Sequence, residues 1–207
     1  MQLLIISTMC LYLSGCLSGK FVYYEPKNTT PKKNSITVNK SKEDVWGTII
    51  PKLGSEFFVI NNLDKDSGLI NISYNGSPEK YIDCGSLWSQ VSNAKGTRTY
   101  NFLAASSHER FEQADRGVLY FIDRKMYLDG RMNIIVQEID SEKTLVTANA
   151  RYVLKRDSTF SDIQGRSGSS SDTITFNSSQ SGTFPQNETC YATGQFEGDV
   201  LALITEK

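Results

Sequence analysis

Histidine and cysteine are scarce in this chain. It has a single histidine, His108, and four cysteines. Structural and catalytic metal sites need several Cys, His or carboxylate ligands at characteristic spacings, and these scattered residues form no such cluster. The sequence also has no P-loop, no glycine-rich dinucleotide turn, no paired-histidine metal motif and no Gly-x-Ser-x-Gly elbow. We therefore expect a protein without a cofactor or a metal, and not an enzyme.

An excess of positive charge is also missing. The 22 Lys and Arg residues nearly balance the 23 Asp and Glu residues, which gives a formal net charge of −1. Neither half of the chain is strongly basic. Because a nucleic-acid-binding surface is normally basic, no nucleic-acid partner is expected.

Long hydrophobic runs are absent except near the start of the chain. Residues 3 to 13 form an apolar stretch, which is shorter than the roughly 20 residues that a membrane-spanning helix needs. That length suits the hydrophobic region of a signal peptide. No Lys or Arg precedes Cys16, so the terminal amine is the only positive charge there. A buried N-terminal helix or strand is the alternative interpretation.

The apolar stretch is followed by Leu13-Ser14-Gly15-Cys16, which resembles the bacterial lipobox. The resemblance implies that residues 1–15 are a signal peptide and that Cys16 becomes the lipid-modified first residue. Each buried CH₂ of an attached acyl chain contributes about 0.8 kcal/mol, so several chains hold the protein on the membrane. The residue after the cysteine is Leu17 and not Asp, which implies the periplasmic face of the outer membrane.

Residues 16–34 contain two prolines and many small polar residues, which favours a flexible tether after the lipidated cysteine. Within it, the apolar residues 21–24 are expected to dock on the domain. Residues 35–207 are long enough for one domain with an ample core. In that domain, residues 157–188 are rich in Ser, Gly, Thr, Asp and Asn and are predicted to be a mobile loop.

Residues 36–74 have the pattern of a strand, a helix and a hairpin. Ser41 with an acidic residue three positions later is a helix-capping signal, and Pro51 is expected to kink or end the helix near Ile50. Two β-like runs, residues 57–61 and 69–74, are joined by turn-forming residues. The helix carries an apolar stripe at Val45, Trp46, Ile49, Ile50 and Leu53.

This unit resembles the repeated unit of the BamC-like family of outer-membrane assembly lipoproteins. The match covers about 40 of the 207 residues, and Pro51 departs from it. The family's domains have a helix-grip fold, in which a helix packs across a curved antiparallel sheet. The matching residues are Trp46, Phe58, Ile60, Asp64, Gly68 and Ile70.

Alternating apolar and polar residues over 132–136 and 146–154 predict a hairpin. After Thr193, apolar residues at helical spacing from Phe196 to Ile204 predict a C-terminal helix. The expected fold is therefore α+β: a curved antiparallel sheet packed by an N-terminal and a C-terminal helix, similar to a helix-grip domain.

Two cysteines, Cys84 and Cys190, lie in the main domain. In an oxidising periplasm they can pair, and a bridge across roughly 106 residues would stabilise the fold by at most about 4.7 kcal/mol in the entropy model. Two separate buried thiols are the alternative.

Two aromatic residues, Trp88 and Phe111, are candidates for an exposed interface with a partner. Ser107 and His108 together raise the hypothesis of a hydrolase, against which a solvated loop histidine is the simpler interpretation. The leading functional hypothesis is a non-enzymatic accessory or scaffold in a cell-envelope protein assembly, with outer-membrane lipid and envelope proteins as partners. The alternative is a small apolar or lipid ligand held in a cavity between sheet and helix.

Overall fold

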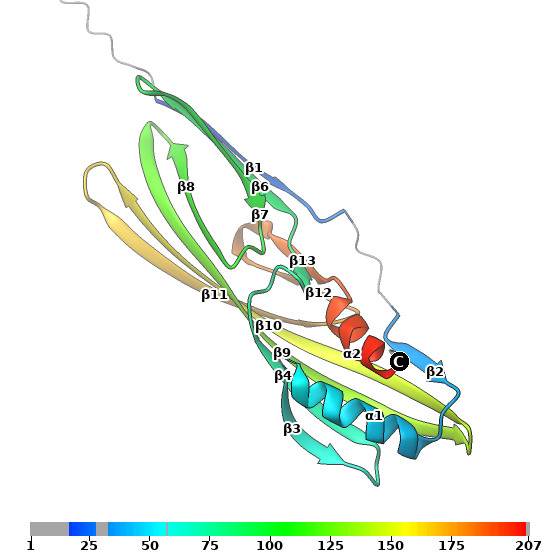
Figure 1. Cartoon of the computed structure of the whole chain (residues 1–207). Helices are drawn as coiled ribbons and strands as arrows, with labels where there is room; N and C mark the ends of the chain where they lie inside the picture. Colours follow the sequence, from blue (N-terminus) through cyan, green and yellow to red (C-terminus); the bar gives the residue numbers. More distant parts are fainter. Residues whose placement is uncertain (1–16, 28–32, 57, 206–207) are drawn as a thin grey trace, which may run out of the picture.

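The computed structural model describes residues 17–27, 33–56 and 58–205 of the chain. The fold is mostly β, with 61% strand and 15% helix. The expected helix-grip α+β fold is therefore wrong: several sheets are present, and helices cover only one part of the molecule (Figure 1). The described helices are α1 (Lys42–Ser55) and α2 (Gln195–Thr205), with a short 3₁₀ turn η1 (Pro185–Asn187). The strands are β1 (Ser18–Tyr24), β2 (Ser35–Val38), β3 (Val59–Asp64), β4 (Leu69–Gly76), β5 (Ile82–Asp83), β6 (Ser86–Asn93), β7 (Gly96–Leu103), β8 (His108–Asp115), β9 (Val118–Asp140), β10 (Lys143–Asp162), β11 (Ser167–Asn177), β12 (Ser181–Thr183) and β13 (Thr189–Ala192).

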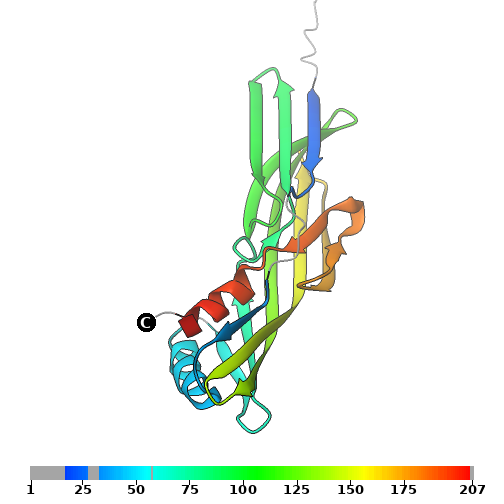
Figure 2. The ribbon, with the colours of Figure 1, turned by 90° about the vertical axis from the view of Figure 1, so that its right-hand side faces the viewer.

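A long antiparallel hairpin of β9 and β10 runs through the whole molecule (Figure 2). It belongs to a seven-stranded sheet of order β11-β10-β9-β4-β3, in which β2 also pairs with β10 and β8 with β9. Along the edge that does not pair with β10, β9 has two different partner strands. Residues 128–135 pair with β4, and residues 118–125 pair with β8. This change of neighbour divides the molecule into a helical half and a sandwich half.

In the helical half, α1 and α2 cover the face of the sheet formed by even-numbered residues of β9 and β10. The hairpin predicted from alternating apolar and polar residues is confirmed, because buried and exposed residues alternate along both strands. The predicted C-terminal helix is also confirmed. Phe196 of α2 is fully buried and lies near Gly130, where an added Cβ would come within 3.0 Å of its ring. The Lys52 ammonium of α1 donates a hydrogen bond to the Leu203 carbonyl oxygen of α2 at 2.7 Å, which joins the two helices.

Helix α1 begins as predicted but ends later. Ser41 is its N-cap, and the Ser41 hydroxyl accepts a hydrogen bond from the Asp44 N–H. Pro51 was expected to kink or end the helix near Ile50; the helix does not end there but continues through Pro51 to Ser55. Packing explains the difference, because Leu53 beyond the proline is fully buried in the core and stabilises the last turn.

In the sandwich half, a three-stranded sheet of order β1-β6-β7 packs against β8 (Figure 1). The predicted tether is thus partly structured, because residues 18–24 form β1 and pair with β6 along their whole length. Tyr23 fixes β1 further. Its hydroxyl donates to the Thr189 carbonyl oxygen at 3.1 Å and accepts from the Thr189 N–H at 3.0 Å.

The prediction that residues 157–188 form a mobile loop was also wrong. Residues 157–162 complete β10, and residues 167–177 form β11, which pairs with β10 from Arg151 to Ser161. Ser- and Thr-rich segments of this kind form strands when a partner strand pairs with the backbone N–H and C=O groups along one edge. A third small sheet, of order β12-β13-β5, lies between the two halves.

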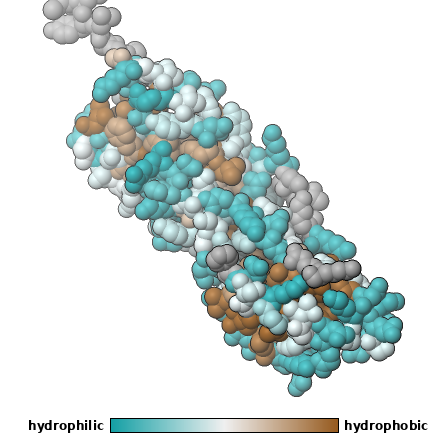
Figure 3. All heavy atoms as spheres, viewed as in Figure 1, coloured by the Kyte–Doolittle hydropathy of each residue, from teal (hydrophilic) through white to brown (hydrophobic). Residues whose placement is uncertain are grey.

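Hydrophobic residues gather on two parts of the face seen in Figure 3, the sandwich half and the region around the helices, with hydrophilic residues between them. In the part of the chain that the structure describes, none of the helices combines the length and apolar character needed to cross a bilayer.

Candidate functional site

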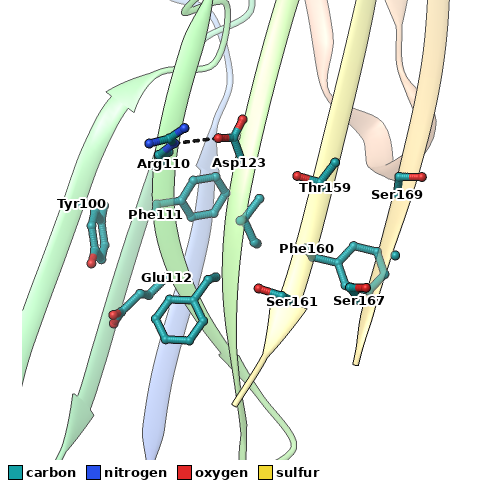
Figure 4. A pocket seen from close by; sticks show the side chains of 13 residues that line it. Tyr100, Arg110, Phe111, Glu112, Asp123, Thr159, Phe160, Ser161, Ser167 and Ser169 are labelled. Atoms are coloured by element: carbon teal, nitrogen blue, oxygen red, sulfur yellow. Dashed lines mark hydrogen bonds and ion pairs between the residues drawn. The ribbon is translucent and has the colours of Figure 1, made fainter. Parts of the chain in front are cut away.

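A cleft lies between the two sheets of the sandwich half. One hollow of about 380 Å³ is bounded by β1 and β6 on one side and by β8 to β11 on the other. We call this hollow the inter-sheet cleft, and Phe111, Ile122 and Phe160 are among the residues that line it. A second hollow of about 690 Å³, shown in Figure 4, has Tyr100 of β7 at one side. It is lined mainly by residues of β8 to β11 that alternate with Phe111, Ile122 and Phe160, so it lies on the other face of the sheet.

The floor of the inter-sheet cleft is an apolar row across three neighbouring strands. Phe111, Ile122 and Phe160 are successive cross-strand partners on β8, β9 and β10, so their side chains lie on one face of the sheet. The next partner on β11 is Gly168, where an added Cβ would lie 2.5 Å from the Phe160 ring. A larger residue there would displace the Phe160 ring, which covers this part of the strand. Phe160 keeps 42% of its surface exposed.

The roof of the cleft packs on Phe111. The rings of Phe21 on β1 and Phe111 are stacked with 6.1 Å between centroids, and Phe102 on β7 lies 5.0 Å from Phe111. Phe111 is only 5% exposed. The prediction that it lies at an exposed interface is therefore corrected, since it forms the inner wall of the cleft.

At its inner end the cleft reaches a group of buried charges. Arg124 of β9 and Arg156 of β10 are each 5% exposed, and Glu188 is 7% exposed. Arg124 donates to both carboxylate oxygens of Glu188, at 3.2 and 2.8 Å, and Arg156 lies 3.1 Å from the same carboxylate. Fork geometry of this kind gives strong, directional pairing.

Further contacts hold Arg156 in place. Its guanidinium donates to the Asp172 carboxylate at 2.8 Å and to the Gln186 side-chain oxygen at 2.7 Å, and it lies 4.5 Å from the centre of the Phe184 ring. The turn at residues 184–188 brings Gln186 and Glu188 to the cleft. Gln186 and Asn187 have positive φ angles there, and the Phe184 N–H closes the turn on the Glu188 carbonyl oxygen at 2.8 Å.

Arg124 is incompletely satisfied. Its two terminal nitrogens are bonded to Glu188 and to the Ala104 carbonyl oxygen, but the buried Nε–H finds no acceptor among the described residues. Burial lowers the pKa of Arg124 from its ordinary value, while the Glu188 carboxylate acts in the opposite direction. A buried donor without an acceptor costs free energy, so this nitrogen lowers the stability that the Arg124–Glu188 pair contributes.

The structure tests the predicted disulfide but not the predicted lipidation site. Cys84 and Cys190 lie at disulfide distance, with 2.06 Å between their Sγ atoms, and both are fully buried. Their pairing links β13 to the chain just before β6, and so connects the small sheet between the halves to the roof of the cleft. Cys16, the predicted lipidation site, lies outside the described residues.

Trp88 and His108 lie on strands and not in loops. Trp88 is half-buried on β6, with the Lys20 ammonium 5.9 Å from its ring. The exposed imidazole of His108 on β8 lies 3.1 Å from the Asp123 carboxylate, which also accepts from Arg110 at 2.6 Å. Among the described residues, the ring contacts this carboxylate and no serine hydroxyl. That arrangement is an ion-pair cluster on the surface of β8 and β9.

Sequence reasoning missed Arg124, Arg156 and Glu188. A signal was available for the two arginines, because each occupies an even, inward-facing position of its strand: Arg124 lies between Ile122 and Met126, and Arg156 lies between Leu154 and Ser158. A charged residue in that register indicates a buried, paired charge. For Glu188 the sequence carried no comparable signal.

No protein-family model, curated protein or solved structure matches this chain. Within residues 17–27, 33–56 and 58–205, no group of three or more His, Cys, Asp or Glu side chains has the geometry to hold a metal ion.

Proposed function

We propose that this protein is a non-enzymatic, lipid-anchored binding protein of the bacterial outer membrane, facing the periplasm, and that the inter-sheet cleft holds the apolar chain of a lipid. The observation that carries the proposal is the combination of an apolar row and two arginines at its inner end in one cleft. Small-ligand sites are typically concave, mainly apolar and supplied with a few directed polar groups. Phe111, Ile122 and Phe160 would contact the chain, and Arg124 and Arg156 would lie nearest the polar end of the ligand.

The position of the proposed anchor supports a lipid as the ligand. Cys16 lies two residues before Ser18, the first residue of β1, and a chain spans at most about 3.6 Å per residue. A lipid on Cys16 would therefore begin within about 7 Å of β1, which forms part of the roof of the cleft. The sandwich half would lie directly at the membrane surface, with no long spacer between the bilayer and the cleft.

The first experiment tests the anchor. The wild-type chain and Cys16→Ala are expressed in a bacterial host fed with labelled palmitate, and membranes are separated by density. We expect label and outer-membrane fractionation for the wild-type protein and neither for the variant. Equal labelling of both would remove the anchor from the proposal.

A second experiment tests the cleft. Wild-type protein, Phe160→Ser and Tyr127→Ser are purified in the same detergent, and organic solvent is used to release lipid that is not covalently attached. Tyr127 is the matched control, because it is an exposed aromatic residue of β9 outside the cleft. We expect about one lipid per wild-type or Tyr127→Ser molecule and a several-fold loss in Phe160→Ser. Equal lipid in all three samples would contradict the cleft as the site.

A second candidate function is that of an accessory or scaffold in an envelope protein assembly. The observation that favours it is a pair of exposed apolar side chains, Ile135 (41% exposed) and Ile139 (54% exposed), on β9. They lie toward the C-terminal end of β9, beyond the segment that pairs with β8. Crosslinking in cells followed by mass spectrometry would test this role, with Ile139→Ser expected to lose a partner that Tyr127→Ser retains.

A further inference from the structure

The face of the seven-stranded sheet that points away from the helices carries two arginines side by side. Arg131 on β9 and Arg151 on β10 are direct cross-strand partners, and both are exposed. Like charges directly opposite each other destabilise an antiparallel pair. Such a pair therefore suggests a counter-charge that is supplied from outside.

The protein itself neutralises this pair poorly. The Asp129 carboxylate lies 3.7 Å from Arg131, at the limit of an ion pair, and both side chains are well exposed. Arg151 has no acidic partner among the described residues. Pairs of this kind in solvent contribute little, so most of the positive charge remains available to a ligand.

The two arginines lie in a hollow of about 760 Å³ whose other polar lining groups are uncharged. Two of these groups, Asn71 and Asn133, are linked across β4 and β9 by a hydrogen bond of 2.7 Å, and Asn149 lies next to Asn133 on β10. None of the described residues that line the hollow is acidic. Its lining residues are Asn71, Arg131, Asn133, Asn149, Ala150, Arg151, Thr175, Phe176, Asn177 and Gln180.

The chemistry of this lining selects a class of ligand. Guanidinium groups bind carboxylate or phosphate oxygens. Side-chain amides both donate and accept hydrogen bonds, and so match hydroxyl groups that do the same. We propose that this hollow, the arginine–amide site, binds an acidic saccharide. Its acid group would lie between Arg131 and Arg151, and its hydroxyl groups would contact the amides of Asn133, Asn149 and Asn177.

The test uses calorimetric titration of the full-length protein with four probes. They are a tetramer of galacturonic acid, the neutral tetramer of galactose, a tetramer of glutamic acid, and inorganic phosphate. We expect the galacturonate tetramer to bind at least tenfold more tightly than each of the others. If tetraglutamate or phosphate binds equally well, the site recognises charge alone and the saccharide proposal is overturned.

Variants locate the binding. Arg151→Gln should weaken galacturonate binding at least tenfold, because it removes one of the two guanidinium groups without altering the core. Lys95→Gln is the matched control, since it removes one positive charge from the exposed turn between β6 and β7. Equal weakening in both variants, or in neither, would contradict the site.

The same sugar occurs free or carried by a lipid, and a further arm of the experiment separates the two sources. Vesicles that display lipid-linked galacturonic acid are compared with the free tetramer. A gain of tenfold or more on vesicles supports a membrane glycolipid as the source, and equal binding supports a free saccharide. Failure here leaves the lipid content of the inter-sheet cleft unaffected, because Arg131 and Arg151 lie outside that cleft.

Discussion

Glu188 is the acceptor that two buried arginines of the sandwich half share. Removing one partner of a buried ion pair leaves an uncompensated charge, which typically costs about 3–5 kcal/mol. We expect Glu188→Gln to lower the free energy of unfolding by that amount, measured by urea denaturation. Glu43→Gln is the control, because the Glu43–Lys65 pair is 2.7 Å long but exposed and should contribute less than about 1 kcal/mol. If both variants lose a similar free energy of unfolding, the buried network stabilises the fold no more than an exposed ion pair does.

The Asp123 carboxylate gives a second prediction at the residue scale. Hydrogen bonds from Arg110, and then from His108, lower the pKa of Asp123 below its ordinary value of 3.8. Because the folded-state pKa is lowered, the stabilisation is fully present above about pH 4 and is lost as the pH falls through the folded-state value. NMR titration should find the Asp123 pKa below 3.8 in the wild-type protein and closer to 3.8 in Arg110→Gln. An unchanged value in the variant would contradict the assigned cause.

Pro51 in the interior of helix α1 lowers the stability of the protein. Pro51 lacks an N–H for the helical hydrogen bond, and proline in a helix interior is up to about 3 kcal/mol less favourable than alanine. Pro51 is exposed, so Pro51→Ala should raise the free energy of unfolding by about 1–3 kcal/mol. Gly54→Ala in the same helix meets no atom within 4 Å and should contribute only about 0.5–1 kcal/mol. Thermal unfolding of both variants tests whether Pro51→Ala stabilises the protein more than Gly54→Ala does. If Pro51→Ala gives no gain in stability, Pro51 does not destabilise the helix.

The sequence predicted some strands well and others not at all. The hairpin over 132–154 was predictable because one face is apolar and the other is polar, so its residues alternate. Residues 167–173 have no such alternation, because both faces of that part of β11 are largely polar and exposed. Their strand structure depends on pairing with β10, which no local pattern reveals.

The same distinction applies to the candidate site. Phe111 was recognised as important but was placed on the surface, since its burial depends on β1, a segment predicted to be a tether. Glu188 could not have been predicted to contact Arg124, which is 64 residues away. Glu188 follows the positive-φ turn at residues 186–187 and lies two residues before Cys190, and that turn and the Cys84–Cys190 link are properties of the folded chain.

The whole molecule is long for its mass. Strand β9 has 23 residues, which at about 3.3 Å per residue spans up to about 75 Å. A compact domain of this size has a radius of gyration of about 16 Å. We expect small-angle X-ray scattering of the monodisperse protein to give about 20 Å or more, with a maximum dimension set by the hairpin. A radius near 16 Å would mean that the two halves fold onto each other in solution.

The continuous β9–β10 hairpin also has a mechanical consequence. Its strands run along the long axis, and β1 is parallel to that axis at one end (Figure 1). A pull between the start of β1 and the far end of the hairpin acts along the strands. It loads the interstrand hydrogen bonds in shear, all together, and does not unzip them one at a time. The molecule would therefore be stiff under tension and would resist extension far better than a chain of small domains joined by linkers.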